Sequence, residues 1–185
     1  GFRKVPFSKE LYIEKDDFKE NANSKYFRLT LGKEVRLKNA YIIKGESVVK
    51  DADGNITEIH CTYDADSRSG SGTEASLRKV KGTLHWVSVP HAVNAEIRLY
   101  DRLFLNENPD KGGEFLQNLN SESCKTLSNS KLEPSLTDPE NCTYQFERNG
   151  YFIKDEKDSN RGKLVFNRAV SLRDSWAKFL KQIGK

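Results

Sequence analysis

The sequence predicts an all-β fold made of two tandem, related β-barrels with short helices. Many short segments carry apolar residues two positions apart, which is the period of a strand, and turn residues separate these segments. Little helix is expected between them, which favours barrels over a parallel strand–helix sheet. A β-branched residue followed two positions later by leucine and then by Asn or Asp recurs at 35–39, 97–101 and 170–174. This internal echo favours two related β units.

Strand signals dominate the first half of the chain. Strands are expected at 5–7, 11–13, 27–31, 34–44, 48–50 and 56–63. Asp16 is a good N-cap for a helical turn over 16–21, and Gly32 interrupts the strand signal. The Asp-Gly pair at 53–54 predicts a hairpin turn. Residues 67–73 are rich in Ser and Gly, which predicts a flexible loop.

The second half repeats this organisation. Strands are expected at 82–88, 95–104, 143–148, 151–153 and 164–166, with a polar loop at 106–113 and a short helix at 114–119. The Asn149-Gly150 pair lies between two arms of alternating apolar residues and is a strong hairpin signal. Amphipathic spacing predicts a helix from Trp176 to Ile183.

A hinge at Pro90 and His91 divides the chain. We therefore expect a first barrel over residues 1–90, a second over 91–174 and a short helical tail over 175–185. A closing strand could pass from one barrel to the other. The chain lacks methionine and opens directly on a strand approach, so we expect it to be part of a longer protein.

Composition points to a cytoplasmic protein, and the sequence contains none of the common catalytic motifs. The 185 residues carry a formal net charge of +4, which permits a polyanionic partner. No apolar run is long enough to cross a bilayer, and no signal peptide opens the chain. The three cysteines are widely spaced, which suggests neither a disulfide framework nor a zinc cluster. Phosphate loops, nucleophile elbows and His-Glu-x-x-His motifs are absent from the sequence.

Basic residues beside aromatics and amides are the remaining functional signal. Arg36 and Lys38 lie on one face of their expected strand, about 6 to 7 Å apart, a spacing that could follow phosphates. In the 149–150 hairpin, Tyr144, Phe146 and Arg148 are expected on one face, and Gln145 is free to read a base edge on the other. Unpaired RNA is read in this way. Cations on the wet face of a strand are also common without any ligand, so composition alone leaves both interpretations open.

Several motifs carry a family resemblance. They lie, in order, at 5–8, 31–41, 61–66, 79–88, 97–104, 145–152 and 166–168. Together they resemble the C-terminal anticodon-binding region of bacterial-type glutaminyl-tRNA synthetase, a class I aminoacyl-tRNA synthetase. The resemblance implies two barrels like that of a ribosomal 5S-RNA-binding protein, which bind the anticodon loop of tRNA(Gln). It also implies that the catalytic domain, which uses ATP and Mg²⁺, lies outside this chain, so this chain is expected to have no catalytic site and to need no cofactor. We expect it to be a monomer.

The resemblance assigns roles to particular residues. Arg28 corresponds to the family's arginine for the third anticodon base, Arg36 and Lys38 to the residues for the first, and Gln145 with Arg148 to those for the central uridine. Lys38 stands where the best-known members have arginine, and Phe27 where they have lysine. Two alternatives remain: a stand-alone RNA- or ribosome-associated barrel protein, and a basic barrel that binds an acidic protein.

Overall fold

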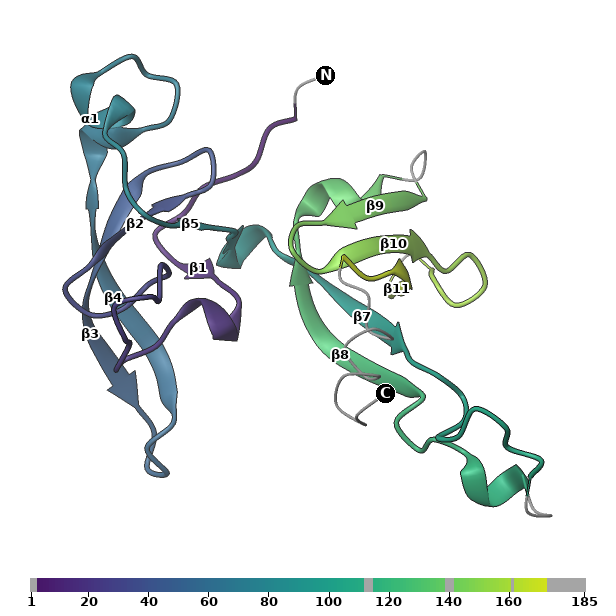
Figure 1. Cartoon of the computed structure of the whole chain (residues 1–185). Coiled ribbons are helices and arrows are strands. Elements are labelled where there is room, and N and C mark those ends of the chain that lie inside the picture. Colours follow the sequence, from purple (N-terminus) through teal and green to yellow (C-terminus); the bar gives the residue numbers. More distant parts are fainter. Residues whose placement is uncertain (1–2, 112–114, 139–141, 161, 173–185) are drawn as a thin grey trace. The chain divides into compact units, whose positions relative to one another are not determined.

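The computed structural model describes residues 3–111, 115–138, 142–160 and 162–172 (Figure 1). The chain divides into two compact units. The N-terminal unit is Phe7–Pro90, and the C-terminal unit combines His91–Lys185 with the first six residues, Gly1–Pro6. The tail over 175–185 and the helix expected from Trp176 to Ile183 lie outside the described residues. The expected domain boundaries stay predictions.

The N-terminal unit contains a four-stranded sheet with the order β4-β3-β2-β5. Its strands are β2 (Glu34–Leu37), β3 (Ile42–Lys50), β4 (Ile56–Asp64) and β5 (Thr83–Leu84). The β2–β5 pair is parallel and the other pairs are antiparallel. A second, two-stranded sheet pairs β1 (Leu11–Tyr12) with β6 (Val87–Ser88). Short helices complete the unit: α1 (Glu74–Leu77) and 3₁₀ turns at Lys15–Asp17, Ala65–Ser67 and Val89–His91.

The period-two pattern of β2 places its apolar side chains in the core. Val35 and Leu37 are fully buried beside Ile42 and Leu84, whereas Arg36 between them is half-buried. The hairpin expected around 53–54 is confirmed as β3 and β4, with Gly54 at φ 82°. β2 therefore has one buried face and one face available to polar groups.

Three local expectations in this unit are wrong. The strand expected over 34–44 is broken by a turn in which Asn39 adopts φ 56°, so β2 and β3 form a hairpin. Residues 27–31 form only isolated bridges, Phe18 with Leu29 and Leu31 with Gly45. The helical turn expected over 16–21 is a 3₁₀ turn at Lys15–Asp17, and its N-cap position is Glu14, which makes no side-chain capping hydrogen bond. The Ser- and Gly-rich loop itself leads into α1, which Thr73 caps by accepting a hydrogen bond from the Ser76 N–H. Tertiary pairing, which single-segment patterns do not contain, sets these boundaries.

The C-terminal unit contains a five-stranded mixed sheet with the order β8-β7-β11-β10-β9. The strands are β7 (Val93–Tyr100), β8 (Cys124–Leu132), β9 (Thr143–Phe146), β10 (Gly150–Lys154) and β11 (Leu164–Val170). Two 3₁₀ turns lie at Phe115–Asn118 and Pro134–Thr137. The parallel β7–β11 pair joins segments far apart in the sequence. The core of the C-terminal unit contains Ala95, Ile97, Phe152 and Phe166. The Phe146 ring stacks on the Phe152 ring, with 4.3 Å between the ring centroids.

The mostly β architecture is confirmed, whereas closed barrels are not seen. None of the three sheets formed by the described residues closes on itself. β8 was not expected, because Cys124–Leu132 contains only two leucines among polar residues. No helix in the described part of the chain has the length and apolar character needed to span a bilayer.

Candidate nucleic-acid interface

Arg36 fixes a neighbouring segment of the N-terminal unit. Its Nη1 donates hydrogen bonds to the Ser67 carbonyl at 2.8 Å and the Ser69 hydroxyl at 3.2 Å. Its Nη2 donates to the carbonyls of Ser76 at 3.0 Å and Arg78 at 3.1 Å. Four of the five guanidinium N–H groups are thus used inside the chain. In this structure Arg36 holds the segment 67–78 against β2.

Lys38 differs from Arg36 because its backbone is fixed while its side chain is exposed. The Lys38 N–H donates to the Leu84 carbonyl at 2.9 Å, and the Lys38 carbonyl accepts from the Trp86 indole N–H at 2.9 Å. Arg36 and Lys38 therefore do not form the common cationic face that the sequence predicts. Of the two side chains, only that of Lys38 is exposed.

Arg28 forms an ion pair with a buried carboxylate. Its Nη1 lies 3.1 Å from Oδ1 of Asp17, a fully buried carboxylate, and 3.1 Å from the Asp16 carbonyl. The Arg28 side chain is nevertheless 40% exposed. Its charge is held in place and partly open to solvent.

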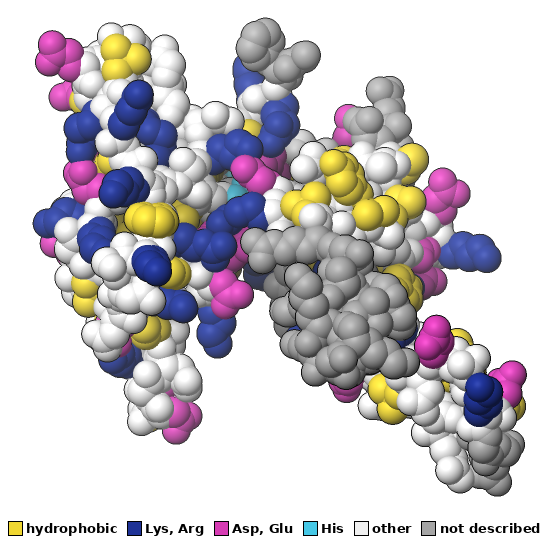
Figure 2. Space-filling model, viewed as in Figure 1, with side chains coloured by type: hydrophobic (Ala, Val, Ile, Leu, Met, Phe, Trp, Pro, Cys, Tyr) yellow, Lys and Arg dark blue, Asp and Glu magenta, His cyan; other side chains and the backbone are white. Residues whose placement is uncertain are grey.

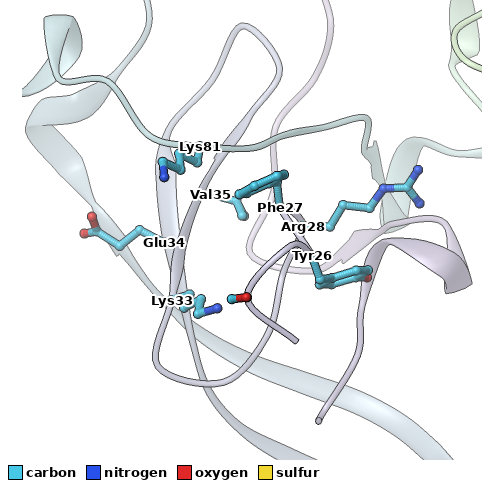
Figure 3. A pocket seen from close by; sticks show the side chains of 8 residues that line it. Tyr26, Phe27, Arg28, Lys33, Glu34, Val35 and Lys81 are labelled. Atoms are coloured by element: carbon cyan, nitrogen blue, oxygen red, sulfur yellow. The ribbon is translucent and has the colours of Figure 1, made fainter. Parts of the chain in front are cut away.

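A pocket of about 240 Å³ lies beside Arg28. Its lining residues are Ser24, Tyr26, Phe27, Arg28, Lys33, Glu34, Val35 and Lys81 (Figure 3). The Phe27 ring is 53% exposed, and the Lys81 ammonium lies 5.6 Å from its centroid. The volume is below the range of about 300 to 1,000 Å³ typical of drug-sized ligands. An aromatic wall with cations at its rim suits one planar, anionic unit such as a nucleotide.

Gly82 allows the close approach that shapes this pocket. A Cβ at Gly82 would lie 2.3 Å from the Phe27 carbonyl oxygen and 3.1 Å from a Val35 methyl group. The Gly82 carbonyl also accepts the Arg36 N–H at 2.8 Å. Only glycine therefore fits between Phe27 and β2 at this point.

Gln145 and Arg148 lie in the C-terminal unit. Gln145 is exposed on β9, and its amide makes no hydrogen bond within the described residues, whereas Tyr144 and Phe146 face the core. The hairpin is confirmed, but its turn comes earlier than expected: Gly150 pairs with Phe146, and Arg148 adopts φ 65°. Arg148 is thus at the tip of the turn and does not share a face with Tyr144. The amide of Gln145 remains available for a base edge.

The five predicted site residues fall in two groups, and their roles stay predictions. Arg28, Arg36 and Lys38 belong to the N-terminal unit, and Gln145 and Arg148 to the C-terminal unit. Figure 2 shows Lys and Arg side chains spread over the visible face of the N-terminal unit. Sequence reasoning missed Lys33 and Lys81 as pocket residues. Each of these lysines has a glycine beside it in the sequence, Gly32 before Lys33 and Gly82 after Lys81. These glycines were the available signal.

Comparisons with known proteins define the class. Residues 1–64 and residues 83–155 each match a family described as tRNA synthetases class I (E and Q), anti-codon binding domain. The chain therefore belongs to the anticodon-binding domains of the class I tRNA synthetases, and the resemblance drawn from the sequence is confirmed.

The relatives are glutaminyl enzymes. The chain is 54% identical over 178 residues to the glutamine–tRNA ligase of Yersinia pestis (strain Pestoides F) and to that of Yersinia pseudotuberculosis (serotype O:1b, strain IP 31758). Each alignment covers 96% of this chain and 32% of the relative. The chain thus spans about a third of the length of these relatives.

Proposed function

We propose that this chain binds the anticodon stem-loop of tRNA(Gln) on behalf of a glutamine–tRNA ligase. The observation that carries the proposal is the family match in both units, together with the cation-rimmed aromatic pocket at Phe27 and Lys81 in the N-terminal unit. Anticodon bases unstack, and buried polar groups reject a wrong base at a cost of about 1 to 3 kcal/mol for each group left unpaired. Lysine and arginine contacts with phosphates supply affinity that falls with salt.

The roles of single residues are part of this proposal. Arg28 serves the third anticodon base, Lys38 with Arg36 the first, and Gln145 with Arg148 the central uridine. The Lys38 ammonium acts as a point charge, since a lysine cannot form the bidentate pair of an arginine. Arg36 acts through the segment 67–78 that it holds.

The larger setting also belongs to the proposal. In the complete enzyme each unit would form one of two barrels, which the parallel β2–β5 and β7–β11 pairs support by joining distant segments. We also assign ATP and Mg²⁺ to the rest of the enzyme, as the family resemblance implies. That enzyme would act as a monomer in the cytoplasm, where tRNA is charged.

The test is a binding titration with anticodon stem-loop RNA. We expect the cognate tRNA(Gln) stem-loop to bind more tightly than single-base anticodon variants at two salt concentrations, because base selection survives when phosphate contacts are screened. A charge-matched acidic polypeptide should bind weakly. Equal affinity for cognate and altered anticodons would refute the proposal, and preference for the acidic polypeptide would favour a protein-binding barrel instead.

A further inference from the structure

We propose that four aromatic rings of the N-terminal unit form a ladder whose outer ring, Tyr63, stacks on an unpaired RNA base. The rings belong to Trp86, Phe7, Tyr41 and Tyr63. This inference rests on the proposed function and adds a stacking site that is separate from the Phe27 pocket, whose lining includes none of these residues.

The rings form a row that has a buried ring at one end and an exposed ring at the other. Trp86 and Phe7 have centroids 5.1 Å apart, Phe7 and Tyr41 also 5.1 Å, and Tyr41 and Tyr63 5.5 Å. Trp86 is only 6% exposed, whereas Phe7 is 41% and Tyr63 61% exposed. Aromatic pairs at these separations attract one another in tilted and edge-to-face arrangements, as seen here. The buried indole therefore anchors a series of rings that ends in solvent.

The ladder begins at a predicted RNA-binding residue. The Trp86 indole N–H donates to the Lys38 carbonyl at 2.9 Å, and Tyr41 follows Lys38 by three positions across the Asn39 turn. The Tyr41 carbonyl accepts the Leu37 N–H at 2.8 Å, which fixes the other side of this turn. A nucleotide whose phosphate meets the exposed Lys38 ammonium therefore has aromatic rings within the same unit on which to place a base.

Electrostatics and chemistry favour a base over an apolar segment of protein. Asp64, next to Tyr63, is paired with Arg78 at 3.0 Å, which offsets its repulsion of a phosphate. The hydroxyls of Tyr41 and Tyr63 make no hydrogen bond within the described residues. They can therefore bind water or form a hydrogen bond with a ribose hydroxyl. Every base has a π-face, and stacking on an exposed aromatic ring contributes about 1 to 3 kcal/mol. Binding of an aliphatic protein surface would not require a row of three neighbouring tyrosine or phenylalanine rings.

The experiment compares substitutions at Tyr63 in the whole chain, with affinity for the tRNA(Gln) anticodon stem-loop as the readout. We expect Tyr63→Ala to weaken binding about ten-fold, a size typical of one lost base stack. Tyr63→Phe keeps the ring and should stay within about two-fold of the unsubstituted chain. Tyr63→Leu keeps apolar area without an aromatic face and should resemble Tyr63→Ala. Tyr12→Ala, an exposed tyrosine of the same unit outside the ladder, is the matched control.

Each outcome decides between the interpretations. Unchanged affinity in Tyr63→Ala overturns the ladder while leaving anticodon binding intact, and full affinity in Tyr63→Leu replaces base stacking by apolar contact. A drop in Tyr12→Ala equal to that in Tyr63→Ala would also count against it. If the unsubstituted chain binds an unrelated RNA hairpin as tightly as the anticodon stem-loop, the proposed function fails and the ladder fails with it. Circular dichroism of each variant verifies the fold, which the high exposure of Tyr63 should leave unchanged.

Discussion

Phe27 and Lys81 show how a local departure from the family pattern is accommodated. Phe27 stands at a position where the family resemblance leads us to expect lysine, yet a cation is still present there, because the Lys81 ammonium lies 5.6 Å from the Phe27 ring centroid. A cation over a ring is attracted to its π-face. The pocket thus combines stacking with charge, although the two properties come from different segments.

Lys81 should contribute to the salt dependence of RNA binding. Replacing it by glutamine removes one phosphate-neutralising charge, so the slope of log K against log salt should become less negative by about one unit. Stem-loop titrations between low and moderate salt measure this slope. The control is Lys50→Gln, since the Lys50 ammonium is already paired with Glu20 at 2.7 Å. Equal slopes in the unsubstituted chain and Lys81→Gln would contradict a phosphate contact.

Gln145 should determine selection at the central anticodon base. Its exposed amide has no partner within the described residues, so Gln145→Ala should lower discrimination against an altered central base by about ten-fold, in line with one lost polar contact. Thermal unfolding should change little, because the side chain is exposed. Gln117→Ala, another exposed glutamine, serves as the control. Unaltered discrimination in Gln145→Ala would remove Gln145 from the site.

At the scale of elements, Arg36 connects β2 to the segment that leads through α1. Its bonds to Ser67, Ser69, Ser76 and the Arg78 carbonyl span both ends of this segment. Arg78 adds ion pairs to Glu34 and Asp64. The composition of residues 67–73 predicts flexibility, but the two arginines tie the segment to the sheet.

Loss of Arg36 should loosen this segment. We expect Arg36→Met to speed tryptic cleavage after Arg68 and Lys79 and to lower the free energy of unfolding by about 1 to 3 kcal/mol, since the lost bonds come from a charged donor. Arg36→Lys should rescue little, because one ammonium cannot reach carbonyls at both ends. Lys33→Met removes the same charge from a neighbouring position and is the control. Cleavage at the unsubstituted rate would exclude the clamp.

A second element-scale feature is a charge cluster on the C-terminal sheet. Arg98 lies 2.7 Å from Glu96 and 2.6 Å from Asp158, and Lys163 lies 2.9 Å from Glu96. Hydrogen bonds from Lys163 and then Arg98 lower the pKa of Glu96. Hydrogen bonds from the Asp158 backbone N–H and the Asn167 side chain lower the pKa of Asp155.

These lowered pKa values make the stability of the C-terminal unit depend on acid pH. A carboxyl group whose pKa is lower in the folded than in the unfolded state stabilises the fold fully above its unfolded pKa of about 4, and this contribution is lost as the pH falls through the folded value. We expect urea unfolding to show lower stability at about pH 3 than at about pH 6. The decrease should be smaller in Asp155→Asn and unchanged in Asp110→Asn, an exposed control. The same decrease in Asp155→Asn as in the unsubstituted chain would contradict this origin.

At the scale of the whole molecule, the first residues belong with the C-terminal half of the chain and not with the segment that follows them. Residues Gly1–Pro6 group with His91–Lys185. The Arg3 guanidinium forms a two-point ion pair with Glu133, at 2.9 and 3.1 Å. The Glu133 side chain is only 11% exposed, whereas that of Arg3 is 63% exposed.

Arg3 should therefore stabilise the C-terminal unit alone. Arg3→Met should lower the free energy of unfolding of that unit by about 1 to 2 kcal/mol, a value limited by the screening of the exposed Arg3 charge. Hydrogen exchange measured by mass spectrometry should become faster in β7 and β8 and stay constant in β2 and β3. Arg68→Met, an exposed arginine of the N-terminal unit, is the control. Faster exchange in β2 and β3 would show that the effect is not confined to one unit.

The sequence alone determined the β class, the two hairpins around Gly54 and Gly150, and the family, because strand periodicity, turn residues and motif strings are local properties of the chain. It also singled out Arg28, Arg36, Lys38, Gln145 and Arg148. Only the tertiary structure decided which of their side chains remain available: Arg36 is used on the segment 67–78, and Arg148 lies at a turn tip. It also decided the strand state of β8, the pocket at Phe27 and the aromatic series from Trp86 to Tyr63. These features join residues far apart in the chain, and a periodic pattern carries no information about which distant partner a side chain will meet.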